Sequence, residues 1–95
     1  MKVKSKNTGA VFDAYQYSNE DFDNLSKALK ESFDSTYILE VGPQKVDPVL
    51  KMLFNNVCVL ELNANDWFVV NVDNKLKNRA VSNEDFKSTF EEMTV

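Results

Sequence analysis

The sequence predicts an α+β domain with a bent antiparallel sheet of five or six short strands, one amphipathic helix packed on that sheet, and a short C-terminal helix. Residues 67–72, WFVVNV, form an almost unbroken aromatic and β-branched run that is typical of a buried central strand. Residues 22–33 carry apolar side chains at helical spacing. Turn pairs rich in asparagine separate short alternating segments, which favours hairpins. The chain of 95 residues has the length of one domain, residues 1–95.

The first predicted strand covers residues 10–17, AVFDAYQY, whose imperfect alternation indicates two partly covered faces. The polar run SNED at residues 18–21 then predicts a helix start, because carboxylates are favoured near the N-terminus of a helix. The apolar residues of this helix should pack on the sheet: Phe22, Leu25, Leu29 and Phe33. The pentapeptide SNEDF occurs again at residues 82–86, and we interpret both copies as helix starts.

Further short strands are predicted in the middle of the chain. Residues 36–41, TYILEV, alternate, and Gly42-Pro43 ends this strand. The stretch before Pro48 should be extended, because proline disfavours a helical conformation at the residue that precedes it. Residues 49–54, VLKMLF, fit either a strand or a helix by their periodicity, and the turn that follows them favours a strand.

That turn is Asn55-Asn56, and the predicted partner strand is residues 57–62, VCVLEL. Cys58 lies inside this apolar run, so we interpret it as a small buried side chain rather than a nucleophile. Because the chain has one cysteine, it cannot form an internal disulfide.

The central strand, residues 67–72, should place Trp67 and Val69 on one side of the sheet and Phe68 and Val70 on the other. An Asn-Asp pair before the strand predicts a tight turn. Asp73-Asn74 after it predicts a short hairpin turn, with alternation that resumes at Lys75-Leu76-Lys77. We expect Trp67 to be largely buried and to have a structural role.

A closing helix is predicted from about Asn83. Ser82 stands three residues before Asp85, which is the spacing of an N-terminal capping pair. The aromatic and apolar residues that follow are Phe86, Phe90 and Met93.

The residues from the central strand to the closing helix follow a definite order. Its conspicuous members are Asp66, Trp67, Phe68, Val69, Phe86 and Phe90. This order resembles a family of small bacteriophage and prophage proteins, whose C-terminal halves commonly read Gly-Asp-Trp-Ile-Val, then a turn, then Phe and a final aromatic residue. The chain departs from the family at Asn65, usually Gly, and at Phe90, usually Tyr, while FDAYQY at residues 12–17 loosely resembles the family's start. The resemblance covers about half the chain; it implies a phage or prophage origin and supplies no mechanism.

The composition argues against catalysis. The chain has no histidine, which removes the commonest general base and metal ligand. It has two glycines and no glycine-rich loop that would hold a phosphate. It also lacks a Cys/His cluster for zinc and an Asp-rich loop with the spacing of a calcium site. We therefore expect neither an enzyme nor a cofactor or metal site.

The charge argues against direct binding of nucleic acid, because the net charge is −4 and the pI is about 4.7. We interpret the lysines at positions 2, 4 and 6 as part of a solvated terminus. Arg79 is the only arginine, which counts against phosphate recognition. No apolar stretch has the length of a membrane span or the pattern of a signal peptide, so the expected location is the cytoplasm of a bacterial host.

Acidic side chains remain as the candidate contact surface for a partner protein. The residues that should project from the two helices are Glu20, Asp23, Glu31, Asp34, Glu91 and Glu92. Two acidic helix surfaces would imitate a phosphate backbone and occupy a basic groove on a partner. The alternative interpretation is that these carboxylates only keep the domain soluble.

Three functions fit these observations. The first is a non-enzymatic phage or mobile-element accessory protein that binds a host protein, for example an anti-CRISPR-type inhibitor of a nucleic-acid-binding effector. The second is a small phage structural or assembly protein, or a homo-oligomer that uses Tyr15, Tyr17 and Tyr37 at its interface. The third is a small-ligand binder, such as a sponge for a nucleotide signal, built at a dimer interface. The lack of catalytic groups and the phage-like C-terminal pattern favour the first function.

Overall fold

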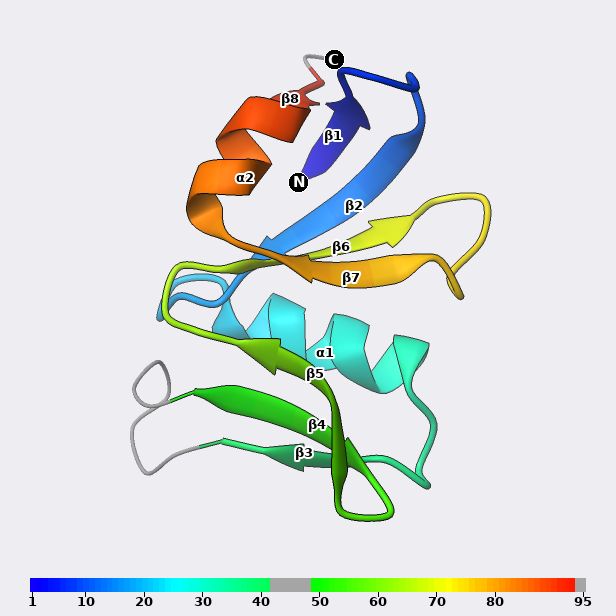
Figure 1. The fold of residues 1–95 in the computed structure, drawn as a ribbon, viewed down its shortest axis with the longest axis vertical. Coiled ribbons are helices and arrows are strands. Elements are labelled where there is room, and N and C mark those ends of the chain that lie inside the picture. Colours follow the sequence, from blue (N-terminus) through cyan, green and yellow to red (C-terminus); the bar gives the residue numbers. More distant parts are fainter. Residues whose placement is uncertain (42–48, 94–95) are drawn as a thin grey trace.

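The computed structural model describes residues 1–41 and 49–93, which form eight strands and two helices. The strands belong to two antiparallel sheets, one of five strands and one of three, which lie at opposite ends of the molecule with a helix between them (Figure 1). The predicted α+β class is confirmed, and the strands are divided between two sheets. The predicted strand end at Gly42-Pro43 and the extended stretch before Pro48 lie outside the described residues.

The five-stranded sheet has the order β7-β6-β2-β1-β8. Its strands are β1 (Lys2–Ser5), β2 (Val11–Gln16), β6 (Trp67–Asn71), β7 (Asn78–Val81) and β8 (Phe90–Glu92). The three-stranded sheet has the order β3-β4-β5, and its strands are β3 (Ile38–Glu40), β4 (Leu50–Phe54) and β5 (Val57–Leu62). The two helices are α1 (Phe22–Ser32) and α2 (Asn83–Thr89).

Strand β6 is buried on both sides, as predicted for the central strand. It pairs with β2 on one side and with β7 on the other. Phe68 and Val70 belong to one hydrophobic cluster, and Trp67 and Val69 belong to a second. Because successive side chains of a strand point to opposite faces, the five-stranded sheet has a separate core on each face.

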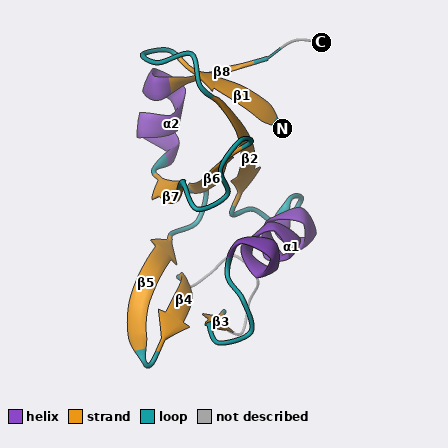
Figure 2. Cartoon of the chain, turned by 90° about the vertical axis from the view of Figure 1, so that its right-hand side faces the viewer, coloured by secondary structure: helices purple, strands orange, loops and turns teal. Residues whose placement is uncertain are grey.

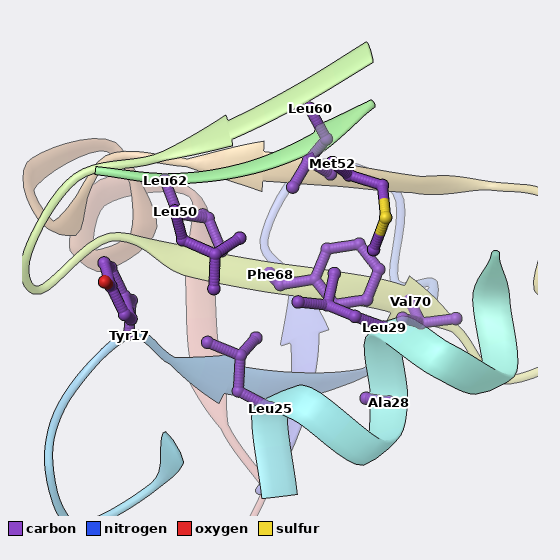
Figure 3. Packing of buried hydrophobic residues seen from close by; sticks show 10 residues of the cluster. All are labelled: Tyr17, Leu25, Ala28, Leu29, Leu50, Met52, Leu60, Leu62, Phe68 and Val70. Atoms are coloured by element: carbon purple, nitrogen blue, oxygen red, sulfur yellow. The ribbon is translucent and has the colours of Figure 1, made fainter. Parts of the chain in front are cut away.

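The larger cluster, which we call the aliphatic core, lies between the five-stranded sheet, α1 and the three-stranded sheet (Figure 3). Its members are Tyr17, Leu25, Ala28, Leu29, Leu50, Met52, Leu60, Leu62, Phe68 and Val70. Leu25 and Leu29 project from α1 into this core, and Phe22 and Phe33 pack at its margin with partly buried rings. The predicted packing face of the first helix is therefore confirmed.

The second cluster, which we call the aromatic core, lies on the opposite face of the five-stranded sheet, under α2 (Figure 2). Its members are Val3, Ala14, Trp67, Val69, Val81, Phe86 and Phe90. Trp67 is only 9% exposed, and its ring stacks on Phe86 with centroids 4.0 Å apart. The indole Nε1–H donates a hydrogen bond of 2.9 Å to Asn83 Oδ1. Trp67 is therefore a core residue, as predicted.

Two strands of the five-stranded sheet were missed by the sequence analysis. The expected solvated terminus is β1, in which Val3 is fully buried while Lys2 and Lys4 are exposed. Strand β8 begins where the closing helix was expected to continue. Phe90 ends that helix with an extended backbone, φ −118° and ψ 151°, and pairs with Ser5 of β1. The helix stops because the chain gains a strand partner there.

The predicted turns at Asn55-Asn56 and before β6 are confirmed, whereas the connection after β6 is longer than predicted, because β7 begins at Asn78 and not at Lys75. Asn55 and Asn56, between β4 and β5, have φ values of 51° and 65°, and Asn65, before β6, has a φ of 72°. Asparagine tolerates this left-handed conformation better than most residues, so it closes tight turns of this kind. The turn between β4 and β5 makes a hairpin of residues 50–62, as the sequence predicted.

The prediction that Cys58 is buried is wrong, because its side chain is exposed. The pairing of β4 with β5 shifts by one residue between Met52 and Leu53. Leu60 still pairs with Met52 and faces the core, but Cys58 pairs with Leu53 on the other face, and Val59 is the extra residue of a β-bulge. Because of the bulge, the first three residues of β5, Val57, Cys58 and Val59, are exposed, although the apolar sequence predicted a buried strand.

Candidate functional site

The four acidic residues predicted around the first helix are all exposed. Glu20 precedes α1, Asp23 lies in its first turn, Glu31 lies in its last turn and Asp34 follows it. Lysines lie between these carboxylates, since α1 also exposes Lys27 and Lys30. The helix itself therefore carries two negative and two positive side chains, and its surface is of mixed charge.

Asp34 also has a local role in the turn after α1. Its Oδ1 accepts the Thr36 N–H at 2.9 Å and the Thr36 hydroxyl. These two hydrogen bonds, the hydroxyl first, lower the pKa of Asp34 from its ordinary value. At the other side of α1, partial burial raises the pKa of Tyr15, and the nearby Asp13 and Glu31 carboxylates raise it further.

The structure separates the two acidic residues predicted at the C-terminus. Glu91 and Glu92 lie on β8 and not on a helix, so the prediction that they extend a helix surface is wrong. Because they are adjacent in a strand, their side chains point to opposite faces of the sheet. Glu91 lies opposite Lys4, with Oε1 3.6 Å from the Lys4 Nζ. The two carboxylates do not form one acidic surface.

Exposed apolar side chains gather on the three-stranded sheet. Its outer face carries a row that crosses all three strands, in which Ile38 pairs with Leu53 and Leu53 pairs with Cys58. Val59, in the bulge, is 48% exposed, and Ile38 is 61% exposed. We call these four residues, Ile38, Leu53, Cys58 and Val59, the apolar sheet face. The hairpin tip also exposes Phe54 and Val57, but these two residues are adjacent to Leu53 and Cys58 in their strands and therefore point to the opposite side of the sheet.

A charged row borders the apolar sheet face. Glu40 pairs with Lys51, and Lys51 pairs with Glu61, so the next row along the same three strands has two carboxylates and one ammonium group. Glu40 and Glu61 are exposed and Lys51 is half-buried. An apolar centre with a charged margin is the usual composition of a protein–protein interface.

A pocket of about 320 Å³ lies on the aromatic side of the five-stranded sheet. One wall comes from Ser5, Thr8 and Phe12, at the turn between β1 and β2. Phe90 of β8, which pairs with Ser5 and contacts the Phe12 ring, belongs to the same side, and Lys77, Asn78 and Arg79, around the start of β7, complete the lining. We call it the Arg79 pocket. Sequence reasoning did not find it, because its walls come from opposite ends of the chain and share no local motif.

The tyrosines proposed for an oligomer interface lie mostly inside the fold. Tyr17 is fully buried in the aliphatic core and is not available to a partner. Tyr15 and Tyr37 are half-buried and pack against the same core. Tyr37 also contacts the ring of Phe54, with centroids 5.1 Å apart. These rings support the fold, so a tyrosine-based interface is not favoured.

Comparison with known proteins finds no match: no family model, no curated protein and no solved structure is similar to this chain. Neither helix in the described part of the chain is long and apolar enough to cross a membrane. Among residues 1–41 and 49–93, no group of three or more Cys, Asp or Glu side chains is arranged to hold a metal ion.

Proposed function

We propose that this chain is a non-enzymatic accessory protein of a phage or another mobile element, which acts in the bacterial cytoplasm by binding a host protein through the apolar sheet face. The observation that carries the proposal is the concentration of exposed apolar side chains on the three-stranded sheet, above all Ile38 and Val59. The phage origin rests on the C-terminal sequence pattern that begins at Asp66 and Trp67.

Exposure of the apolar sheet face to water has an energetic cost. Burial of apolar surface is favourable by about 25 cal/mol per Å². The chain exposes eight large apolar side chains among the described residues. Two of them, Ile38 and Val59, lie on the apolar sheet face, and two more, Phe54 and Val57, lie at the tip of its hairpin. Exposed apolar side chains that gather on one face of a soluble protein mark interaction sites.

The charge beside the face favours a basic partner over a second copy of the chain. The bordering row of Glu40, Lys51 and Glu61 has an excess of one negative charge, and the whole chain has a net charge of −4. Two copies would bring like charges together, whereas a basic partner supplies complementary charge. An inhibitor of a nucleic-acid-binding defence effector, such as a CRISPR-Cas nuclease, is the narrower form of the proposal.

The direct test compares three forms of the protein as baits in a host lysate. Val59→Lys places a charge in the apolar sheet face, and Leu76→Lys is the matched control, because Leu76 is 86% exposed in the β6–β7 connection. We expect wild type and Leu76→Lys to capture the same host protein, identified by mass spectrometry, and Val59→Lys to lose it. Retention of that protein by Val59→Lys would contradict the proposed surface.

Sedimentation of the purified protein separates the host partner from self-association. A wild-type dimer that Val59→Lys dissociates would show that the apolar sheet face binds a second copy, and it would overturn the proposal. We expect a monomer in both forms, because the charged row beside the face repels its own copy.

The narrower form makes a prediction about salt. If a basic channel is the target, affinity should fall steeply as salt rises, because exposed charges are screened within about 8–10 Å at physiological ionic strength. Reversal of Glu40 and Glu61 to Lys should weaken binding. The carboxylates predicted from the sequence are tested by the same charge reversal in two further variants. One variant changes Glu20, Asp23, Glu31 and Asp34, and the other changes Glu91 and Glu92. A partner whose affinity ignores salt and every reversal would exclude a basic channel and leave apolar contact as the basis of binding.

A further inference from the structure

The geometry points to a second site: the Arg79 pocket binds a small organic anion that has one phosphate or carboxylate head group and a flat apolar body. The five-stranded sheet curls, and α2 covers part of its inner face (Figure 2). The pocket occupies another part of that face, between the β1–β2 turn and the start of β7. Its volume of about 320 Å³ is at the lower end of the range of small-molecule sites.

The charge of the pocket is opposite to that of the whole chain. Its described lining contains two cations, Lys77 and Arg79, and no carboxylate, in a chain whose net charge is −4. A single arginine in the sequence counts against phosphate recognition. The structure places that arginine in this pocket, beside a lysine, where the two groups together attract an anion.

The Arg79 guanidinium lies near an aromatic ring, and no carboxylate of the described residues is paired with it. Its Cζ lies 5.7 Å from the centroid of the Phe90 ring, within the range of a cation–π contact. Among the described residues the ion pairs are Lys2 with Asp13 and Lys4 with Glu91, so Arg79 takes part in neither. A planar guanidinium that rests on a ring and keeps its N–H groups free is suited to bidentate binding of a carboxylate or phosphate.

Two hydroxyl groups in the lining add hydrogen-bond donors. The Ser5 Oγ accepts the Thr8 N–H at 3.4 Å, and the Thr8 Oγ1 accepts the Ala10 N–H at 3.2 Å. Both oxygens are thus engaged as acceptors, and within the described residues neither hydroxyl hydrogen has an acceptor. Each O–H can donate to an anion in the pocket, which supplements the two cations.

The apolar part of the lining indicates which kind of group the ligand carries besides its anionic head. Phe12 and Phe90 meet edge to face, with centroids 5.3 Å apart and planes at 77°. Phe12 is partly exposed and presents apolar surface to the pocket, whereas Phe90 is only 4% exposed and contributes less. Aromatic rings are good packing surfaces for planar groups. A bare inorganic ion would leave this surface uncovered, so the fitting ligand is an aromatic phosphate or carboxylate.

The experiment is an NMR titration of the full-length, isotope-labelled protein with phenyl phosphate, benzoate, inorganic phosphate and phenol. We expect saturable shifts at the amides of residues 5–9 and 77–79 with phenyl phosphate or benzoate at millimolar concentrations. The two aromatic anions separate a phosphate head from a carboxylate head. Inorganic phosphate lacks the ring and phenol lacks the charge, so both should bind more weakly.

Matched variants assign the binding to Arg79. Arg79→Gln should weaken binding by about tenfold or more, because it removes a charge-assisted hydrogen-bonding group. Arg79→Lys should be intermediate, since it keeps the charge and loses the planar fork. Lys27→Gln removes a cation from exposed α1, outside the pocket, and should leave binding unchanged. An unchanged Trp67 indole resonance verifies the fold of each variant.

Three results would overturn the inference. The first is that neither aromatic anion gives a saturable shift. The second is that Arg79→Gln binds as tightly as wild type, and the third is that inorganic phosphate binds as tightly as phenyl phosphate. The Arg79 pocket and the apolar sheet face lie on different sheets, so failure of either site leaves the other standing.

Discussion

The pentapeptide SNEDF occurs at residues 18–22 and 82–86, and the two copies start their helices at different points. In the second copy the serine is the helix N-cap, and the Ser82 carbonyl accepts the first helical N–H at 2.8 Å. In the first copy the fourth residue, Asp21, is the N-cap, and its carbonyl accepts the corresponding N–H at 2.9 Å. Identical local sequences therefore do not fix where the helix begins.

The two copies share a turn and differ in what the aspartate carboxylate contacts. The Asp21 N–H donates to Ser18 Oγ at 3.3 Å, and the Asp85 N–H donates to Ser82 Oγ at 3.1 Å. The Asp21 carboxylate, however, also accepts the backbone N–H of Gln16, at the end of β2, at 2.8 Å. This bond ties the turn to the preceding strand, which explains why the helix begins later. The sequence encodes the turn, and a contact outside the pentapeptide positions the helix.

The phenylalanine that ends each copy also has a different environment. Phe86 is buried and stacks on Trp67 with ring planes only 7° apart. Phe22 lies at the margin of the aliphatic core, and its ring is tilted by 43° to that of Tyr17 at a centroid distance of 6.3 Å. The second copy therefore places its ring one turn into the helix and over the sheet, whereas the first places it at the helix start.

The largest loss of stability is expected from Trp67→Ala. This substitution removes the ring that stacks on Phe86, in the second copy of the pentapeptide, and leaves the first copy unchanged. Loss of this ring from the aromatic core should lower the free energy of unfolding by about 3–5 kcal/mol. Urea denaturation followed by circular dichroism measures the change, because the variant has no tryptophan to report by fluorescence. Trp67→Phe, which keeps a ring, should cost less. A midpoint close to wild type would show that the aromatic core does not hold α2.

The next largest loss of stability should differ between the two phenylalanines, Phe86 and Phe22. Phe86→Ala should cost about 3–5 kcal/mol, as expected for a buried aromatic ring, because it leaves a cavity under α2. Phe22→Ala should cost about half as much, in proportion to the smaller area that its ring buries. Both are measured in the same denaturation experiment. Equal losses would mean that the margin of the aliphatic core is as tightly packed as the centre of the aromatic core.

The two aspartates give the third contrast. Asp21→Ala removes the acceptor for the Gln16 N–H and should cost about 1.5–3 kcal/mol, the usual contribution of a hydrogen bond to a charged group. Asp85→Ala should change stability by about 0.5 kcal/mol or less, because Asp85 is exposed and its carboxylate has no protein partner among the described residues. Similar losses at the two positions would refute the explanation of the later helix start.

Local patterns predicted the elements whose information lies within a few residues. The alternation of residues 67–72 correctly separated Trp67 and Val69 from Phe68 and Val70, because a strand buried on both faces contributes to two cores. The hairpin of β4 and β5 followed from two asparagines that accept positive φ. Both predictions use rules that operate over one turn or one strand.

Other elements depend on partners far away in the sequence. In β1, Lys2-Val3-Lys4-Ser5 alternates, but its lysines are equally typical of a solvated terminus, and only the pairing of Val3 with Phe12 makes the segment a strand. The end of α2 at Phe90 is set by the same strand, and no residue of α2 indicates it. The Arg79 pocket and the apolar sheet face likewise arise from tertiary pairing and from a bulge, so no motif could have predicted either surface.

The smallest contrast concerns the serines that begin the two copies. Ser82→Ala should cost about 1 kcal/mol, because it removes the side-chain acceptor from a helix N-cap. Ser18→Ala should cost only a few tenths of a kcal/mol, because Ser18 accepts in a turn before the helix and the Asp21 carboxylate still holds that turn to β2. Ser82→Asp, which restores an acceptor, should recover most of the loss. In an Asp21→Ala background the Ser18→Ala cost should rise, because serine then remains as the main local support of the turn. If the cost does not rise, the two hydrogen bonds act independently, and the later start of α1 must come from the packing of Phe22 instead.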